Sequence, residues 1–183
     1  MILITTSRRP TRGIRALCND LARSIPHVVR VNRGKMNLDG IAEKAMELNA
    51  DRVIVINRLK GGPGKIEFFQ VGQEGLTPVP PLLYVRGVRL RREFNAKARP
   101  FRSLTITVAP KSPSEIMRTA ESLANFLNLP ILPVSEATAK FQASMHISSD
   151  ASSLTQITFL LLPETVEVGP SLTLSHVVWE IQR

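Results

Sequence analysis

The chain has 183 residues, 43 % of them hydrophobic, and a formal net charge of +9. This length and apolar content suffice for a packed domain and exclude a largely disordered chain. The basic excess indicates a polyanionic partner, either nucleic acid or an anionic membrane surface. The single cysteine, Cys18, excludes an internal disulfide and favours a reducing compartment. Because no apolar run approaches the roughly 18–20 residues of a membrane span, we expect a cytoplasmic protein without a membrane partner.

The charge is unevenly distributed along the chain. Residues 1–102 contain 20 Lys and Arg against 8 Asp and Glu, a net charge of +12. Residues 103–183 contain 4 against 7, a net charge of −3. Such asymmetry indicates that two parts of a chain have different tasks. We therefore expect the first part to contact the polyanion.

The first part predicts strands that alternate with helices. Strands are predicted at residues 2–6, 27–32 and 52–57. The third is apolar on both faces, which is typical of a central strand. Apolar residues at helical spacing from Ile14 to Ile25 predict a helix that ends at Pro26. A second amphipathic helix follows, with Asn37 or Asp39 as its N-cap.

Two further strands complete the first part. Residues 65–71 predict a hairpin with the third strand, around the glycine-rich tip at residues 61–64. Pro78, Pro80 and Pro81 predict an irregular connection, and residues 82–94 predict another strand.

From residue 103 the pattern begins again. Residues 104–108 predict a strand, and Ser112-Pro113-Ser114-Glu115 predicts a helix start with a capping box. A short helix is predicted near residues 135–143. Further strands are predicted at residues 131–134 and 155–162, and a terminal hairpin at residues 165–168 and 172–181.

The second part aligns with the first at an offset of 102 residues. This offset pairs Ile2 with Leu104 and Ile14 with Ile116. Strand and helix periodicity alone produce some matches of this kind. Here the register holds across strand, loop and helix without a gap, so we predict an internal repeat. The expected architecture is two tandem α/β halves packed side by side.

No arrangement of residues predicts catalysis, a metal site, a cofactor or a small-molecule substrate. The glycine run before Lys65 lacks the first glycine and the Ser or Thr of a phosphate-binding loop, and it lies between two strands. Cys18 falls on the apolar face of its helix, as a core residue would. His27, His146 and His176 are dispersed without metal-ligand spacing.

Basic and polar residues follow three of the predicted strands. Because the carboxyl ends of adjacent parallel strands meet at one edge of a sheet, these residues are expected on one surface. Hydroxyl and amide groups among them suit contacts with phosphate and sugar. Aromatic residues make up only 5 % of the chain, which favours backbone and shape recognition of structured RNA over base stacking. The predicted RNA-binding residues are Ser7, Arg8, Arg9, Thr11, Arg12, Arg15, Asn32, Arg33, Lys35, Arg58 and Lys60.

Three segments resemble the Brix domain family, in particular its short archaeal members, which are similar to the small-subunit-processome branch. These segments are ITTSRRPT at residues 4–11, VNRGK at 31–35 and RVIVI at 52–56. The motif positions are Thr5, Thr6, Ser7, Arg8, Pro10, Asn32, Arg33 and Gly34.

The resemblance carries its own expectations about fold and function. It implies a single Brix-like domain over residues 1–183, made of halves 1–102 and 103–183. Each half would resemble the anticodon-binding domain of class IIa aminoacyl-tRNA synthetases. The family implies a non-catalytic ribosome biogenesis factor that binds pre-ribosomal RNA and assists rRNA processing and subunit assembly. Ribosome-assembly proteins are its expected protein partners.

Three alternatives remain open on the sequence. One is a protein–protein interaction module in a ribosome-assembly complex, which exposed apolar residues in the second half would favour. Another is a tRNA-binding accessory module, which a preference for tRNA over rRNA would favour. The last is an enzyme acting on nucleotides or tRNA, which would need a pocket with perturbed titratable groups.

Overall fold

A computed structural model of the chain describes residues 1–59, 62–96 and 99–181. Its strands form one nine-stranded sheet in the order β2-β1-β3-β4-β5-β9-β8-β7-β6. The first half contributes β1 (Ile2–Thr6), β2 (Val28–Arg30), β3 (Arg52–Leu59), β4 (Gly62–Gly72) and β5 (Gly75–Arg89). The second half contributes β6 (Leu104–Val108), β7 (Ala143–Ser149), β8 (Thr155–Leu161) and β9 (Val166–Val178). The helices are α1 (Arg12–Ser24), α2 (Leu38–Glu47), α3 (Ser114–Leu127) and α4 (Val134–Lys140). The predicted α/β class is confirmed.

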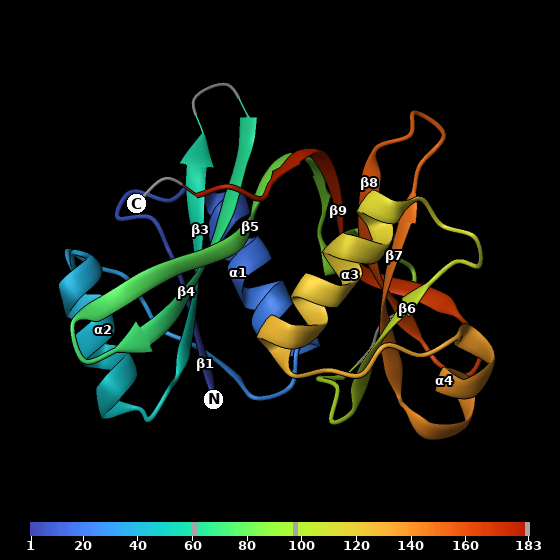
Figure 1. Cartoon of the computed structure of the whole chain (residues 1–183), viewed down its shortest axis with the longest axis horizontal. Coiled ribbons are helices and arrows are strands. Elements are labelled where there is room, and N and C mark those ends of the chain that lie inside the picture. Colours follow the sequence, from blue (N-terminus) through green and yellow to red (C-terminus); the bar gives the residue numbers. More distant parts are fainter. Residues whose placement is uncertain (60–61, 97–98, 182–183) are drawn as a thin grey trace.

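The two longest helices, α1 and α3, share one face of the sheet. They lie in the centre of the molecule, with α2 and α4 at its two ends (Figure 1). Alternation along β1 explains the two layers, because successive side chains point to opposite faces of a strand. Ile2 and Ile4 join the large core beneath α1 and α3, whereas Leu3 packs with Ile41 of α2 in a smaller core. The large core contains residues of both halves, so the halves are packed as one body.

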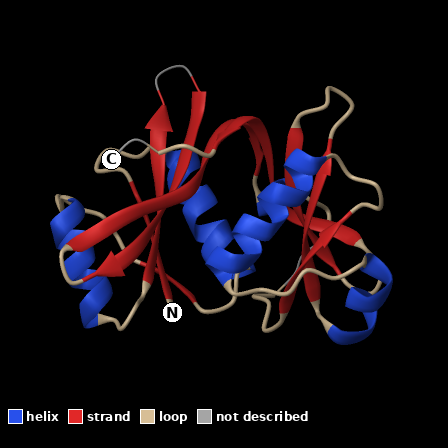
Figure 2. Cartoon of the chain, in the orientation of Figure 1, coloured by secondary structure: helices blue, strands red, loops and turns tan. Residues whose placement is uncertain are grey.

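The order of elements repeats along the chain. The first half runs β1-α1-β2-α2-β3-β4-β5, and the second runs β6-α3-α4-β7-β8-β9. Ile131 takes the place of β2, because it forms an isolated parallel bridge with Ile106 of β6. Both β1 and β6, and both α1 and α3, begin 102 residues apart, at the predicted offset. The antiparallel pair β5 and β9 joins the halves into one continuous sheet, as the strands in Figure 2 show.

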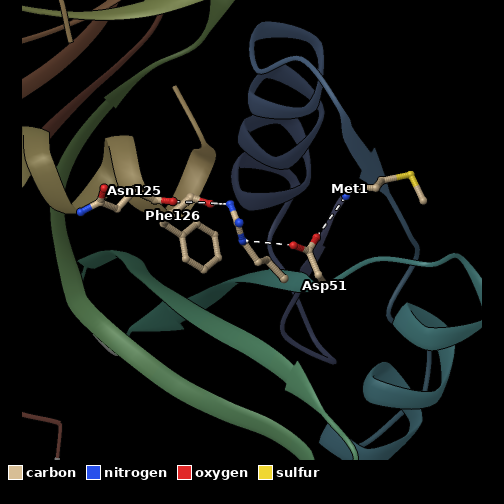
Figure 3. Close-up of polar contacts among 5 residues, drawn as sticks. Met1, Asp51, Asn125 and Phe126 are labelled. Atoms are coloured by element: carbon tan, nitrogen blue, oxygen red, sulfur yellow. Dashed lines mark hydrogen bonds and ion pairs between the residues drawn. The ribbon is translucent and has the colours of Figure 1, made fainter. Parts of the chain in front are cut away.

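Arg52 at the start of β3 also links the halves. Its Nη1 donates a hydrogen bond of 2.5 Å to the carbonyl oxygen of Phe126 in the last turn of α3. The same guanidinium pairs with Asp51, which in turn accepts from the Met1 ammonium at 3.0 Å (Figure 3). Burial is the largest single influence and opposes ionisation of Asp51. The hydrogen bond from that ammonium, a backbone hydrogen bond and the charges of the ammonium and Arg52 together outweigh burial, so the pKa of the carboxyl group is lowered. Because the carbonyls at a helix carboxyl end lack intrahelical partners, Arg52 satisfies an otherwise open end of α3.

The prediction for residues 78–94 was wrong at both ends. β5 runs through Pro78, Pro80 and Pro81, where an irregular connection was expected. Proline is excluded from a central strand because the neighbouring strands on both sides need that strand's backbone N–H groups. β9 pairs with β5 only from Leu82 onward, so the three prolines lie where β5 has no neighbour on that side among the described residues. The strand then ends at Arg89, and a 3-10 turn, η1 (Arg91–Glu93), follows.

The second half also differs from its predicted elements. No strand spans 131–134 within the described residues, because Ile131 makes only its single bridge and α4 begins at Val134. The predicted terminal hairpin is one long strand, β9, whose register with β8 shifts between Thr158 and Leu160. α3 begins after Pro113, and the Ser112 hydroxyl donates to the Ala109 carbonyl oxygen, so the predicted capping box is not formed.

Candidate nucleic-acid interface

The carboxyl ends of three strands lie at the same edge of the sheet, as the sequence predicted. β1 lies between β2 and β3 and runs parallel to both. The chain therefore runs through all three strands in the same direction. Ser7 directly follows β1 and Asn32 lies two residues after β2, whereas Arg58, which was predicted to follow the third strand, is the last but one residue of β3. The amino end of α1 and the carboxyl end of β3 lie at this same end of the molecule (Figure 1).

A hollow of about 740 Å³ lies at this edge, between the segments that follow β1 and β2 and the end of β3. Its lining residues are Ser7, Arg8, Arg9, Gly34, Lys35 and Arg58. The four cationic side chains are exposed. None of them forms an ion pair with a carboxylate in the described part of the chain. Together they make a concave surface of concentrated positive charge. We call this group of six residues the basic edge.

Two features of the hollow favour an anionic ligand. The Ser7 Oγ is buried and has no hydrogen-bond partner within residues 1–59, 62–96 and 99–181. The carboxylate of Glu67 on neighbouring β4 is already bound, because Lys65 lies 2.9 Å from one oxygen and the Asn57 amide donates to the other. The hollow therefore offers a hydroxyl group and several cations, while the nearby negative charge is neutralised.

Arg33 has a structural role instead of lining the hollow. Its side chain is only 9 % exposed. The guanidinium donates from Nε to the Met36 carbonyl oxygen at 2.7 Å and from Nη1 to the Thr6 carbonyl oxygen at 3.2 Å. Burial and the nearby charge of Arg8 lower the pKa of Arg33, and Glu67 partly opposes this. The sequence placed Arg33 among the RNA-contacting residues. In the structure it instead links the loop after β2 to the end of β1.

The remaining predicted residues lie around the hollow. Thr11 is the N-cap of α1, since its Oγ1 accepts from the Ile14 N–H at 3.2 Å. Asn32 is exposed, and its Oδ1 accepts from Arg30 at 2.9 Å. Arg12 and Arg15 are exposed on the first turns of α1. Lys60 lies outside the described residues.

Gly34 was missing from the predicted RNA-binding residues, although it lies in a motif that the sequence analysis quoted. It lines the hollow and adopts φ +54°, a left-handed conformation that glycine tolerates best. A glycine between Arg33 and Lys35, at the end of a short strand, was the signal that marked this turn.

The other titratable candidates lie apart from the basic edge. Burial raises the pKa of the Cys18 thiol to about 11, with Arg30 opposing, so the thiol remains protonated in the core. His146 on β7 lies 2.9 Å from the Thr107 hydroxyl, and burial lowers its pKa against the charge of Glu167. His176 stacks on Tyr84 with ring centroids 4.2 Å apart.

Within residues 1–59, 62–96 and 99–181, no group of three or more His, Cys, Asp or Glu could hold a metal ion. No helix that the structure describes is long and apolar enough to span a membrane.

Comparisons with known proteins define the class first. No protein-family model matches the sequence. The fold is similar to the crystal structure of a probable ribosomal biogenesis protein from Aeropyrum pernix, with a TM-score of 0.77, 26 % identity, and coverage of 97 % of this chain and 98 % of that one. It is also similar to Mil, an archaeal Imp4-like protein, with a TM-score of 0.70 at 19 % identity over 98 % and 100 % of the two chains. The latter likeness is one of fold alone.

Curated relatives then show the family. The chain is 33 % identical over 135 residues to a probable Brix domain-containing ribosomal biogenesis protein of Methanopyrus kandleri. The matched region covers 71 % of this chain and 68 % of the relative. A protein of the same description from Pyrococcus horikoshii is 38 % identical over 115 residues, 61 % of this chain and 51 % of that protein. The chain belongs to the family of Brix domain-containing ribosomal biogenesis proteins, as its motifs predicted.

Proposed function

We propose that the protein is a cytoplasmic ribosome biogenesis factor that binds pre-ribosomal RNA through the basic edge. The observation that carries this proposal is the hollow in which two loops and the end of β3 bring together Arg8, Arg9, Lys35 and Arg58 without carboxylate partners among the described residues. The names of its archaeal relatives support a role in ribosome biogenesis. By holding precursor RNA, the protein would assist rRNA processing and subunit assembly, and this role requires binding alone.

The physical basis of the proposed contact is neutralisation of phosphate charge. Each Lys or Arg that contacts a phosphate releases condensed counterions, so RNA affinity falls as salt rises. The Ser7 hydroxyl inside the hollow and the exposed Asn32 amide add uncharged contacts to phosphate or sugar. These contacts read the backbone and shape of structured RNA, which suits a surface whose lining residues include no aromatic side chain.

The distribution of exposed apolar side chains favours RNA over protein as the main ligand. Large exposed apolar residues are scattered over both halves of the described chain, and the second half contributes only Met117 on α3 and Val166 on β9. A docking surface for a protein would need them gathered into a patch. Ribosome-assembly proteins therefore enter the proposal as secondary partners.

We also infer that halves 1–102 and 103–183 arose by internal duplication and form one Brix-like domain. The repeated element order and the offset of 102 residues between equivalent elements support this. The same order of strands and helices underlies the inferred likeness of each half to the anticodon-binding domain of class IIa aminoacyl-tRNA synthetases. The excess of positive charge in the first half indicates that the halves diverged in task.

The RNA proposal is tested by titrating labelled fragments of archaeal rRNA with the protein at several salt concentrations. We expect affinity to fall steeply with salt. Lys35→Gln with Arg58→Gln should weaken binding about tenfold or more and reduce the salt slope by about 2, one for each phosphate contact. The matched control, Lys44→Gln with Lys111→Gln, removes two cations outside the basic edge, one half-buried and one exposed, and should bind like the wild type. Equal loss in both variants, or tighter binding of tRNA than of rRNA, would contradict the proposal.

A further inference from the structure

A second group of arginines surrounds the segment that joins the two halves. α1 ends at Ser24, and the chain between β5 and β6 returns to that end of the helix. There the Phe101 N–H donates to the Arg23 carbonyl oxygen at 3.4 Å. We call this group the junction cluster. Its members are Arg23, Arg91, Arg92, Arg99 and Arg102.

The fold holds the junction cluster in place. The Arg91 backbone N–H donates to Asp20 of α1 at 2.8 Å, and its Nη1 donates to the Ser24 hydroxyl at 3.0 Å. The same guanidinium lies over the buried Phe101 ring, 5.6 Å from its centroid. These contacts connect segments that are about 70 residues apart in the sequence. The neighbouring arginines therefore extend from an ordered part of the backbone.

A second hollow, of about 440 Å³, lies beside the cluster. Arg99, Phe101 and Arg102 line it from the joining segment, and Gln142, Leu161 and Leu162 line it from the second half. The Arg102 N–H donates to the Gln142 Oε1 at 2.9 Å, which fixes the joining segment against β7 and β8. Both arginines are exposed, so their guanidinium groups reach solvent at the mouth of the hollow.

The junction cluster has more positive charge than its surroundings neutralise. Two carboxylates lie close by. Asp20 accepts from the Arg91 N–H, and Glu93 accepts from the Leu90 N–H at 2.6 Å. Burial lowers the pKa of Arg91; Asp20 opposes this, and the neighbouring charge of Arg23 adds to it. The charges of Arg23 and Arg91 thus repel each other, while Asp20 and Glu93 both accept from backbone N–H groups, so an anion placed there would reduce the repulsion between the arginines.

We propose that the junction cluster is a second phosphate-binding surface and that one RNA contacts both ends of α1. The helix begins beside the basic edge and ends at the junction cluster. Its 13 residues separate the two surfaces by about 20 Å. This inference rests on the proposed function, because the ligand is the same pre-ribosomal RNA. It adds that the bound RNA spans both halves of the protein at their junction.

The inference is tested with Arg99→Gln/Arg102→Gln, whose side chains are exposed and whose loss leaves the Arg91 contacts intact. The probe is a structured fragment of archaeal rRNA that the wild type binds, and Lys44→Gln/Lys111→Gln is the matched control for charge. We expect about tenfold weaker binding and a salt slope smaller by about 2. In hydroxyl-radical footprinting, the wild type should protect two segments of the RNA. The junction variant should lose one of them, and Lys35→Gln/Arg58→Gln should lose the other.

The failures of the two proposals differ in outcome. If the junction variant keeps wild-type affinity, salt slope and footprint while the Lys35 and Arg58 variant loses binding, the second surface is wrong and the basic edge stands. If the wild-type protein binds no rRNA at low salt, the proposed function and this inference both fall. Unchanged thermal unfolding of each variant serves as the folding control.

Discussion

At the scale of single residues, Arg33 and Lys35 show how burial separates two cations of the same loop. Lys35 is exposed and lines the hollow, so its charge is available to a ligand. Arg33 is buried and donates to two backbone carbonyl oxygens. Charge counting treats the two alike, because a sequence records side-chain type but not the direction in which the side chain points. The planar fork of a guanidinium suits two acceptors in a way that an ammonium does not.

We expect Arg33→Ala to destabilise the protein by about 2–3 kcal/mol, because it leaves the Thr6 and Met36 carbonyl oxygens without a charged donor. Arg33→Lys should recover only part of this loss, since one ammonium replaces two fixed N–H donors. Urea unfolding measures the effect. Lys35→Ala, an exposed change in the same loop, is the control and should stay within about 0.5 kcal/mol of the wild type. Equal stability of Arg33→Ala and Lys35→Ala would refute the structural role.

At the scale of elements, α1 places both proposed surfaces. Its apolar stripe packs in the large core, which fixes the helix against the sheet. Its first turn carries Arg12 and no acidic residue, the reverse of what the helix dipole favours. A phosphate near that end would relieve this unfavourable arrangement. The sequence predicted the helix well, because the spacing from Ile14 to Ile25 is local and regular.

Thr11 allows a capping role to be separated from an RNA contact. Thr11→Ala should cost about 1 kcal/mol of stability, because the Ile14 N–H at the start of α1 loses its side-chain acceptor. Thr11→Ser keeps that acceptor and should retain most of the stability in chemical unfolding. If Thr11 acts only as a cap, rRNA affinity at a temperature where both variants are folded should match the wild type. A large loss of affinity in Thr11→Ala alone would instead support the direct RNA contact predicted from the sequence.

At the scale of the whole molecule, the halves are held together by more than the joining segment. β5 pairs with β9, Phe68 of the first half meets Phe126 of the second edge-to-face at 4.8 Å, and Arg52 binds the end of α3. α1 and α3 also share one core. This packing explains why the junction cluster is an ordered part of the surface. When charges are counted along the sequence, Arg99 and Arg102 belong to the first half. The hollow that they line, however, is completed by residues of the second half.

We expect Arg52→Ala to lower the free energy of unfolding by about 1–3 kcal/mol, because the Phe126 carbonyl oxygen loses a charged donor. Unfolding should remain one cooperative transition, since the shared core couples the halves. The fluorescence of Trp179, which packs under Arg118 of α3, reports on the second half, and far-UV circular dichroism reports on the whole chain. Coincident midpoints are expected for wild type and variant. Two separate transitions would show that the halves fold independently.

Sequence patterns alone established most of the element types, the parallel strands at one edge and the family. These features rest on periodicities and short motifs, which are encoded by residues close together in the chain. The fold was needed to show that β5 continues through its prolines and that β9 is one strand, because both depend on which neighbour pairs with each edge. It also decided that Arg33 is buried and that Arg23 lies beside Phe101. The burial of a side chain and the meeting of distant segments follow from packing, and local sequence patterns do not record them.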